Sequence, residues 1–182
     1  MGKVPYIPSS YTAVRNALEL AKVGRGDVLY DLGAGDGRAV IEAARRGALA
    51  VAVEIDPSFS ALISLKAREA GLDDRIIVLE EDFFNTYLGF ATVIYQYLYP
   101  SISRKLALKY SKELRKGTRI IAYNLPIPGW IPVKIYRFID ENGAVSTHYL
   151  YIKGISDPSS WILKHETIPP INTEYVMNIA RD

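Results

Sequence analysis

The chain has 182 residues, of which 49% are hydrophobic and 23% charged, and it carries a formal net charge of +2 at pH 7. These values are typical of one globular domain and do not indicate a basic nucleic-acid-binding groove. The absence of cysteine excludes disulfides, thiolate nucleophiles and Cys-ligated zinc, and two histidines are too few for a His-rich metal site. We therefore expect no metal site.

The sequence contains no run of about 18 apolar residues, so we expect no membrane span. Its first residues, MGKVPYIPSSY, lack the apolar core of a signal peptide, and we expect a cytoplasmic protein. Zero cysteines, one glutamine and two methionines fit a hot-environment origin, because these residues are thermolabile.

Strand-like apolar runs alternate with helical periodicity along the chain. A proline-rich arm, residues 1–10, leads into a first helical pattern after Ser9 and Ser10. Short buried strands are predicted at residues 27–30, 50–53, 76–79, 91–95 and 119–123. Further helices are predicted at residues 38–46, 57–70 and 101–116.

The pattern changes after the fifth strand. Residues 133–138 and 147–152 alternate like strands, and the turn sequence Asp-Glu-Asn-Gly at residues 140–143 predicts a hairpin between them. Five strand–helix units followed by an antiparallel hairpin predict an α/β fold with a mostly parallel sheet and a mixed edge. Residues 155–182 lack clear periodicity and are interpreted as a C-terminal extension of a domain that spans residues 1–154.

The segment YDLGAGDGR, residues 30–38, places Gly33, Gly35 and Gly37 between a strand and a helix. Glycine reaches positive φ without strain and lets the backbone approach a ligand, so such a loop is typical of nucleotide-like ligands. A phosphate-binding P-loop would need a lysine that is absent. A dinucleotide-binding loop would need glycine at the position of Arg38.

The charge of this loop distinguishes a ligand with a pyrophosphate from one with a positively charged group. Asp31 and Asp36 flank its glycines, and carboxylates repel a pyrophosphate. They suit the ammonium and sulfonium groups of S-adenosylmethionine. We therefore predict S-adenosylmethionine as the cofactor of the loop. The cofactor-binding residues expected here are Asp31, Gly33, Gly35, Asp36, Gly37 and Arg38.

The next two strands supply independent support. Glu54 closes the second strand about twenty residues after the loop, followed by Ile55, where a carboxylate can bind both ribose hydroxyls. After the third strand, Asp82 can accept from the adenine amino group and Phe83 can cover the ring. Singly, Asp31 could cap a helix, Glu54 could be solvated and Asp82 could serve a turn. Their coincidence at successive strand ends, where open α/β sheets bind ligands, favours the binding site.

Residues 1 to about 154 resemble the archaeal broad-specificity protein lysine methyltransferases of the seven-strand class and the related mitochondrial lysine methyltransferases. The resemblance is carried by VPYIPS at 4–9, YDLGAGDGR at 30–38, VEID at 53–56, EEDFF at 80–84 and KGTRIIAYNLPIPGW at 116–130. It implies a Rossmann-like seven-strand sheet whose proline-rich arm helps to roof the cofactor pocket. It also implies protein substrates with exposed lysines.

The acceptor chemistry is narrowed by what the chain lacks. After the fourth strand it reads YQYLYP, without the Asn/Asp-Pro-Pro-Tyr/Phe signature of amino-methylating DNA enzymes. Cytosine C5 methylation needs a cysteine nucleophile, and no carboxylate set for a metal-dependent O-methyltransferase is evident. Lysine transfer needs only a deprotonated amine, proximity and a water-poor aromatic channel.

We predict Tyr6, Tyr95 and Asn124 as catalytic residues of that channel, with Tyr97, Tyr123 and Trp130 as further wall candidates, although each aromatic residue could instead be ordinary packing. Tyrosine rings favour cations and their hydroxyls orient an amine. A small-molecule N- or O-methyltransferase is the leading alternative, and a non-catalytic S-adenosylmethionine-binding domain is another. We expect a monomer without a direct nucleic-acid substrate.

Overall fold

The computed structural model describes residues 7–158. They form an α/β fold around one seven-stranded sheet with the strand order β3-β2-β1-β4-β5-β7-β6, in which only the pairings of β7 are antiparallel. The strands are β1 (Val28–Leu32), β2 (Leu49–Glu54), β3 (Ile76–Glu80), β4 (Val93–Gln96), β5 (Arg119–Tyr123), β6 (Lys134–Ile139) and β7 (Val145–Ile152). The helices are α1 (Tyr11–Leu20), α2 (Arg38–Arg45), α3 (Pro57–Glu69) and α4 (Pro100–Glu113).

The predicted fold is confirmed, including the mostly parallel sheet and the antiparallel C-terminal hairpin. The expectation of five strand–helix units is wrong in two places, because within residues 7–158 no helix lies between β3 and β4 or between β5 and β6. The β3–β4 connection instead consists of turns. Asp82 accepts a hydrogen bond from the Phe84 amide, and Thr86 donates to the Glu81 carboxylate. These local side-chain bonds compete with helix formation.

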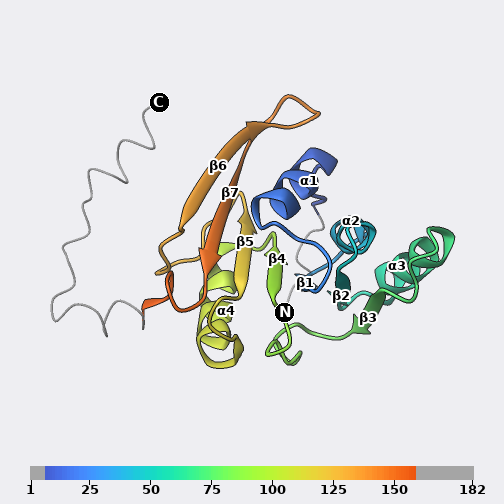
Figure 1. Cartoon of the computed structure of the whole chain (residues 1–182), viewed down its shortest axis with the longest axis horizontal. Helices are drawn as coiled ribbons and strands as arrows, with labels where there is room; N and C mark the ends of the chain where they lie inside the picture. Colours follow the sequence, from blue (N-terminus) through green and yellow to red (C-terminus); the bar gives the residue numbers. More distant parts are fainter. Residues whose placement is uncertain (1–6, 159–182) are drawn as a thin grey trace, which may run out of the picture.

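Two apolar layers cover the sheet. Helices α1, α2 and α3 pack on one face and α4 packs on the other, as Figure 1 shows. Successive residues of a strand point to opposite faces, so Leu29 joins the layer under α1–α3 and Tyr30 joins the layer under α4. The central strands are therefore buried on both sides and read as continuous apolar runs.

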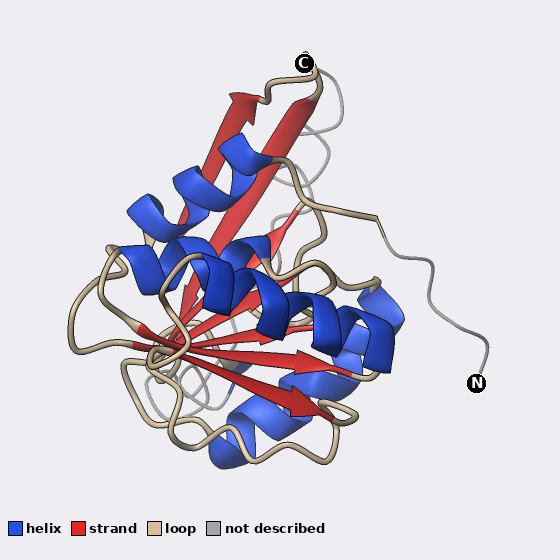
Figure 2. Cartoon of the chain, turned by 90° about the vertical axis from the view of Figure 1, so that its right-hand side faces the viewer, coloured by secondary structure: helices blue, strands red, loops and turns tan. Residues whose placement is uncertain are grey.

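The β6–β7 hairpin reaches past the rest of the sheet (Figures 1 and 2). Strand β5 ends its pairing where Tyr123 meets His148, so the first three residues of β7 extend beyond it. Strand β6 is the outer edge, and five of its six residues are exposed. Helix α1 lies beside the hairpin, where His148 Nε2 is 2.8 Å from the Ala13 carbonyl oxygen.

Tyr6 and the rest of residues 1–6, as well as residues 159–182, lie outside the described residues. The first residues of the predicted extension pack on the domain: Ser156 is buried, and its carbonyl accepts from the Ile131 amide at 3.0 Å. Among residues 7–158, no helix is both long and apolar enough to cross a bilayer.

Candidate active site

The carboxyl ends of β1 to β4 converge at one edge of the sheet. The strand order reverses between β1 and β4, since the chain runs from β1 outward to β3 and then returns. Open α/β sheets bind ligands at such a switch point. Asp31 of β1 and Tyr95 of β4 are register partners across it, and Glu54 ends the neighbouring β2. The predicted residues therefore do come together at one edge.

Asp31 is the unusual group at this edge. Its side chain is buried, and within the described part of the chain no hydrogen bond or ion pair reaches its carboxyl group. Burial, followed by the nearby Glu54 and Asp36 carboxylates, raises the pKa of Asp31 to about 8. A buried carboxyl group beside two others is stabilised in its charged form by a bound cation. The position therefore fits the positively charged end of S-adenosylmethionine.

Glu54 is held in place by the backbone. Its Oε2 accepts from the Gly35 amide at 2.8 Å and its Oε1 accepts from the Asp56 amide at 2.9 Å. Each oxygen keeps a further lone pair, so the oriented carboxylate can still accept hydrogen bonds from a pair of hydroxyls. The side chain of Ile55 next to it is 67% exposed and offers an apolar surface at the same edge.

Asp82 and Phe83 follow β3, the strand beside β2. The Asp82 carboxylate accepts from the Phe84 amide at 2.9 Å, and the Phe83 and Phe84 rings lie 4.9 Å apart in a tilted pair. The backbone connects them to Glu54, whose carbonyl accepts from the Glu81 amide at 3.1 Å. This arrangement places an acceptor and an aromatic ring one strand away from Glu54.

The glycine loop is braced by its own backbone. The amides of Gly33 and Ala34 donate to the Val53 carbonyl at 2.9 and 3.2 Å. Gly37 has a φ of 80°, and a Cβ at this position would lie 2.8 Å from a side-chain carbon of Ile63. Gly37 thus combines a left-handed turn with close packing of the start of α2 on α3, which only glycine permits.

The two aspartates of the loop have different surroundings. Asp36 accepts two hydrogen bonds of 2.9 Å from the Arg38 guanidinium and one of 3.1 Å from Lys66 Nζ. Partial burial raises its pKa, but these hydrogen bonds prevail and lower the pKa of Asp36 to about 2. Asp36 therefore holds the loop against α2 and α3, whereas Asp31 has no such partner among residues 7–158.

Arg38 also connects the loop to the start of α1. Its guanidinium donates to the Ser9 carbonyl and lies 4.7 Å from the centre of the Tyr11 ring. The Tyr95 hydroxyl donates to Ser9 Oγ at 2.9 Å. The role of Ser9 has no local signal in the sequence, because its partners are 29 and 86 residues away. From the sequence, Ser9 indicates only that a helix begins nearby.

Burial raises the pKa of Tyr95 far above its usual value. Tyr95 is therefore protonated at neutral pH and acts as a hydrogen-bond donor. Its neighbours along the edge are Tyr97 and Tyr123, whose rings lie 4.7 Å apart. The expectation that Trp130 shares a wall with these tyrosines is wrong, because Trp130 packs in the α4 layer and the tyrosines pack in the α1 layer.

Asn124 follows β5 in a left-handed conformation with a φ of 56°. Its Oδ1 accepts from the Thr147 amide at 2.8 Å, and its own amide donates to the Thr147 carbonyl at 2.8 Å. The Tyr123 hydroxyl lies 2.9 Å from Ser146 Oγ. These bonds attach the end of β5 to the start of β7, and the Asn124 side-chain NH₂ group keeps its donors.

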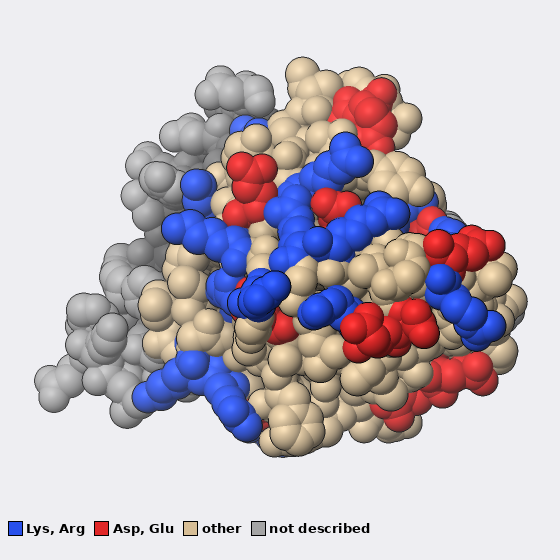
Figure 3. Space-filling model, turned by 45° about the vertical axis from the view of Figure 1, so that its right-hand side comes forward, with Lys and Arg blue, Asp and Glu red and all other residues tan. Residues whose placement is uncertain are grey.

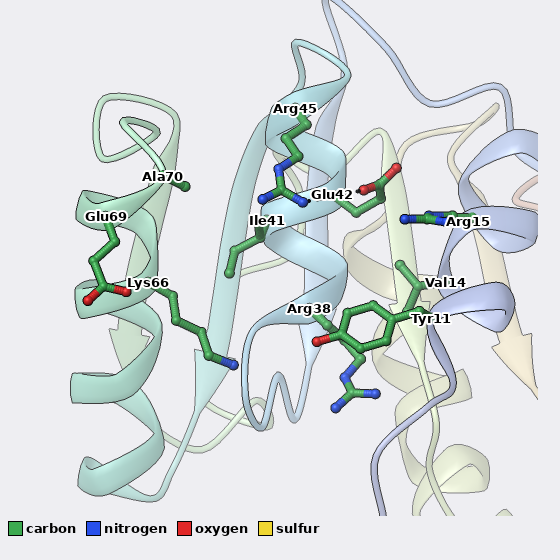
Figure 4. Close-up of a pocket in the computed structure, with 10 residues that line it drawn as sticks. All are labelled: Tyr11, Val14, Arg15, Arg38, Ile41, Glu42, Arg45, Lys66, Glu69 and Ala70. Carbon is green, nitrogen blue, oxygen red and sulfur yellow. Dashed lines mark ion pairs between the residues drawn. The ribbon is translucent and has the colours of Figure 1, made fainter. Parts of the chain in front are cut away.

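A separate hollow of about 350 Å³ lies between α1, α2 and α3 (Figure 4). Arg38 and Lys66 border it, and Tyr11 lies over Arg38 in the close-up. Its remaining lining residues are Val14, Arg15, Ile41, Glu42, Arg45, Glu69 and Ala70. The hollow opens between the helices rather than at the carboxyl edge of the sheet, so we do not place the cofactor in it.

Comparison with known proteins identifies the family. The sequence profile described as the ANTKMT methyltransferase domain matches residues 31–134, which include the glycine loop and the ends of β1 to β5. The chain belongs to this family. It is 35% identical over 153 residues to a protein-lysine N-methyltransferase of Saccharolobus islandicus, covering 83% of this chain and 94% of that protein.

Two further relatives extend this family assignment. An adenine nucleotide translocase lysine N-methyltransferase of Mus musculus is 33% identical over 172 residues, covering 88% of this chain and 75% of that protein. A crystal structure described as an RNA methyltransferase from Salinibacter ruber in complex with S-adenosyl-L-homocysteine is 35% identical. It has a TM-score of 0.75 and covers 90% of this chain and 97% of that one. The ANTKMT-family chain is thus an S-adenosylmethionine-dependent methyltransferase.

Proposed function

We propose that this ANTKMT-family enzyme transfers methyl groups from S-adenosylmethionine to lysine side chains of proteins. The observation that carries the proposal is the buried Asp31 carboxyl at the β1–β4 switch point, next to the tyrosine-bordered edge formed by Tyr95, Tyr97 and Tyr123. Such an edge suits the cationic sulfonium donor and, beside it, a lysine side chain that arrives as an ammonium group and then loses its proton. The archaeal and mouse lysine methyltransferase relatives support the acceptor.

We assign the cofactor-binding roles to residues at the strand ends. Asp31 would hold the ammonium and sulfonium end, Glu54 the ribose hydroxyls, and Asp82 the adenine amino group. Ile55 and Phe83 would pack against the adenine ring. The loop residues Gly33, Gly35 and Gly37 would let the backbone pass close to the ligand, and Asp36 and Arg38 would keep the loop in position.

The acceptor side needs no charged base on the chain. S-adenosylmethionine, when bound, supplies a methyl group to a nucleophile and leaves as S-adenosylhomocysteine. The lysine amine must first lose a proton to water, and its lone pair then forms the new N–C bond as the C–S pair moves to sulfur. Tyr95 and Asn124 would orient the amine through polar contacts, and Tyr6, in the arm, would help to close the site.

RNA is the second candidate acceptor, because the Salinibacter ruber relative is described as an RNA methyltransferase. The distribution of charge favours the lysine acceptor. Acidic residues lie at the ends of β2 and β3 or directly after them and occupy the hairpin tip, namely Asp56, Glu80, Glu81, Asp82, Asp140 and Glu141. On the face in Figure 3, basic side chains gather near the centre with acidic ones around them, so this face is not continuously basic. A polyanion would be repelled at the edge where transfer takes place.

The test incubates the enzyme and methyl-labelled S-adenosylmethionine with a lysine-rich protein, the same protein after lysine acetylation, and total RNA. Acetylation removes the nucleophilic lone pair, so we expect label in the untreated protein only. Peptide mapping should find methylated lysines. Label that survives acetylation, or that enters RNA or a small metabolite instead, would falsify the lysine assignment.

Three expectations from the sequence stay predictions: the cytoplasmic location, the monomeric state and the hot-environment origin. The division into a methyltransferase domain over residues 1–154 and an extension over residues 155–182 is likewise our proposal. The buried Ser156 and Asp157 attach the beginning of that extension to the domain.

A further inference from the structure

The start of α1 is held from three directions. Tyr95 of β4 donates to Ser9 Oγ, and Arg38 of α2 donates to the Ser9 carbonyl. From the hairpin, Glu141 contacts the first turn of the helix through its carboxylate. Its Oε1 accepts from the Tyr11 amide at 2.6 Å and its Oε2 accepts from the Thr12 amide at 3.1 Å. The contacts of Tyr95 and Arg38 come from residues next to the proposed cofactor site, and the contact of Glu141 comes from the hairpin.

Glu141 supplies hydrogen-bond acceptors that the residues around the start of α1 do not provide. The first turn of α1 contains no acidic residue, and Ser10 caps only the Ala13 amide, at 3.0 Å. The first amides of a helix have no partner within it, and the positive end of the helix dipole favours a carboxylate. A residue about 130 positions away therefore supplies both the acceptors and the charge.

The same contact matters for the hairpin. Its tip projects past the end of β5, and isolated two-stranded ribbons are marginally stable in water. Glu141 is exposed at this tip. Slight burial raises its pKa, but the hydrogen bonds from Thr12 and Tyr11 outweigh this and lower the pKa of Glu141 to about 2. The carboxylate is thus charged throughout the working pH range.

We propose that Glu141 is a positioning residue for methyl transfer, which joins the hairpin tip to the start of α1 and so fixes one rim of the acceptor entrance. The joined elements border the tyrosine edge, since the start of β7 is bonded to the end of β5 through Asn124 and Thr147. This inference rests on the proposed function only in placing the acceptor at that edge.

If the Glu141 side chain is removed, the hairpin tip and the start of α1 lose the hydrogen bonds between them. Arg38 and Tyr95 still bind Ser9, next to the cofactor site. Acceptor binding should therefore weaken more than cofactor binding. The side chain does not reach the reacting atoms, so the turnover number should change little. This split distinguishes a positioning role from a general loss of fold.

The experiment compares wild type, Glu141→Ala and Glu141→Gln with the control Glu19→Ala, which removes an exposed carboxylate from α1. For Glu141→Ala we expect the KM for the protein acceptor to rise about fivefold or more, with kcat and the Kd of S-adenosylhomocysteine within twofold. The acceptor KM of Glu141→Gln should lie between those of wild type and Glu141→Ala, because glutamine keeps one oxygen acceptor. Hydrogen exchange at the Tyr11 and Thr12 amides should accelerate in Glu141→Ala, and the control should match wild type.

An unchanged acceptor KM in Glu141→Ala, with faster exchange at both amides, overturns the proposal. A fall in kcat and in melting temperature that accompanies the rise in KM also overturns it, because that pattern indicates a merely structural role. If Glu141→Ala does not fold, the same measurements on Glu141→Gln decide. If wild type methylates RNA or a small molecule instead of lysine, the proposed function fails, and the KM for that acceptor tests Glu141 in the same way.

Discussion

Asp31 and Tyr95 are register partners on the neighbouring strands β1 and β4, and both side chains are buried. The Tyr95 hydroxyl donates to Ser9 rather than to Asp31, so the carboxyl group lacks a neutralising partner in the described part of the chain. Burial raises the pKa of both groups. Around neutral pH the ligand-free site therefore holds a proton on Asp31 that a cationic ligand must displace.

Cofactor affinity should rise with pH in the neutral range. The pKa of Asp31 is raised to about 8, and the cationic ligand prefers the ionised form. Below this pKa each pH unit costs up to about tenfold in association constant. Calorimetric titration with S-adenosylmethionine between pH 6 and 7.5 should show this slope and release of about one proton. Asp31→Asn should bind more weakly and without the slope, whereas the exposed Asp73→Asn should behave as wild type.

The cofactor edge was largely predictable from the sequence. Strand periodicity locates where β1, β2 and β3 end, and parallel strands bring their carboxyl ends to one edge. Asp31, Glu54 and Asp82 could therefore be grouped without coordinates. The seventh strand and the hairpin were also predictable, because alternation and an Asp-Glu-Asn-Gly turn are local signals.

Contacts between distant residues could not be predicted in the same way. The bonds of Ser9 to Tyr95 and of Glu141 to Tyr11 join residues 86 and 130 positions apart, and neither has a local pattern. Within residues 7–158 Asp36 is paired and Asp31 is not, and this difference depends partly on Lys66, which binds Asp36 from α3 although it is 30 positions away. The face of the sheet that Trp130 joins depends on the path of residues 124–133, which has no periodicity.

Arg38→Lys should weaken cofactor binding although it keeps the charge. Lysine offers a single ammonium group, whereas Arg38 makes two hydrogen bonds to Asp36 and also contacts Ser9 and Tyr11. We expect the Kd of S-adenosylhomocysteine to rise about tenfold and the melting temperature to fall by a few degrees. The control is Arg45→Lys on the same helix, because the Arg45 side chain is 60% exposed and its ion pair with Glu42 is long, at 4.0 Å. Equal effects of the two variants would contradict the loop-holding role.

Gly37→Ala should be strongly destabilising for two separable reasons. The substitution forces a left-handed conformation on alanine, and its Cβ would lie 2.8 Å from Ile63. Gly26→Ala is the matched control, since Gly26 has a φ of 90° with no atom within 4 Å of the added Cβ. We expect the control to lose about 1 kcal/mol of unfolding free energy and Gly37→Ala to lose about 3 kcal/mol. Urea denaturation of wild type, Gly37→Ala, Ile63→Ala and the double variant measures the contact as a coupling energy, and Gly26→Ala is measured in the same way.

His148 should make the fold sensitive to mild acid. Burial, despite the hydrogen bond to Ala13, lowers the pKa of His148 to about 4, below the unfolded value of 6.5. The unfolded chain then binds the proton that the native state excludes, so stability is complete above pH 6.5 and is lost as pH falls towards 4. Each pKa unit corresponds to about 1.4 kcal/mol. In His148→Gln the melting temperature should change less between pH 7 and 5 than in wild type, and an equal change would contradict the assignment.

The rate of methyl transfer should climb between pH 7 and 9 even with cofactor at saturation. A lysine amine has an unperturbed pKa of about 10.4, so each pH unit below it lowers the reactive fraction about tenfold. Tyr95 offers no base, because its pKa is raised and it stays protonated throughout this range. Saturation separates this effect from the titration of Asp31, which acts on cofactor binding. Single-turnover rates measured across this range should rise with a slope near one in log units. A rate that is flat above pH 7 would show that the enzyme deprotonates its acceptor with a group of its own.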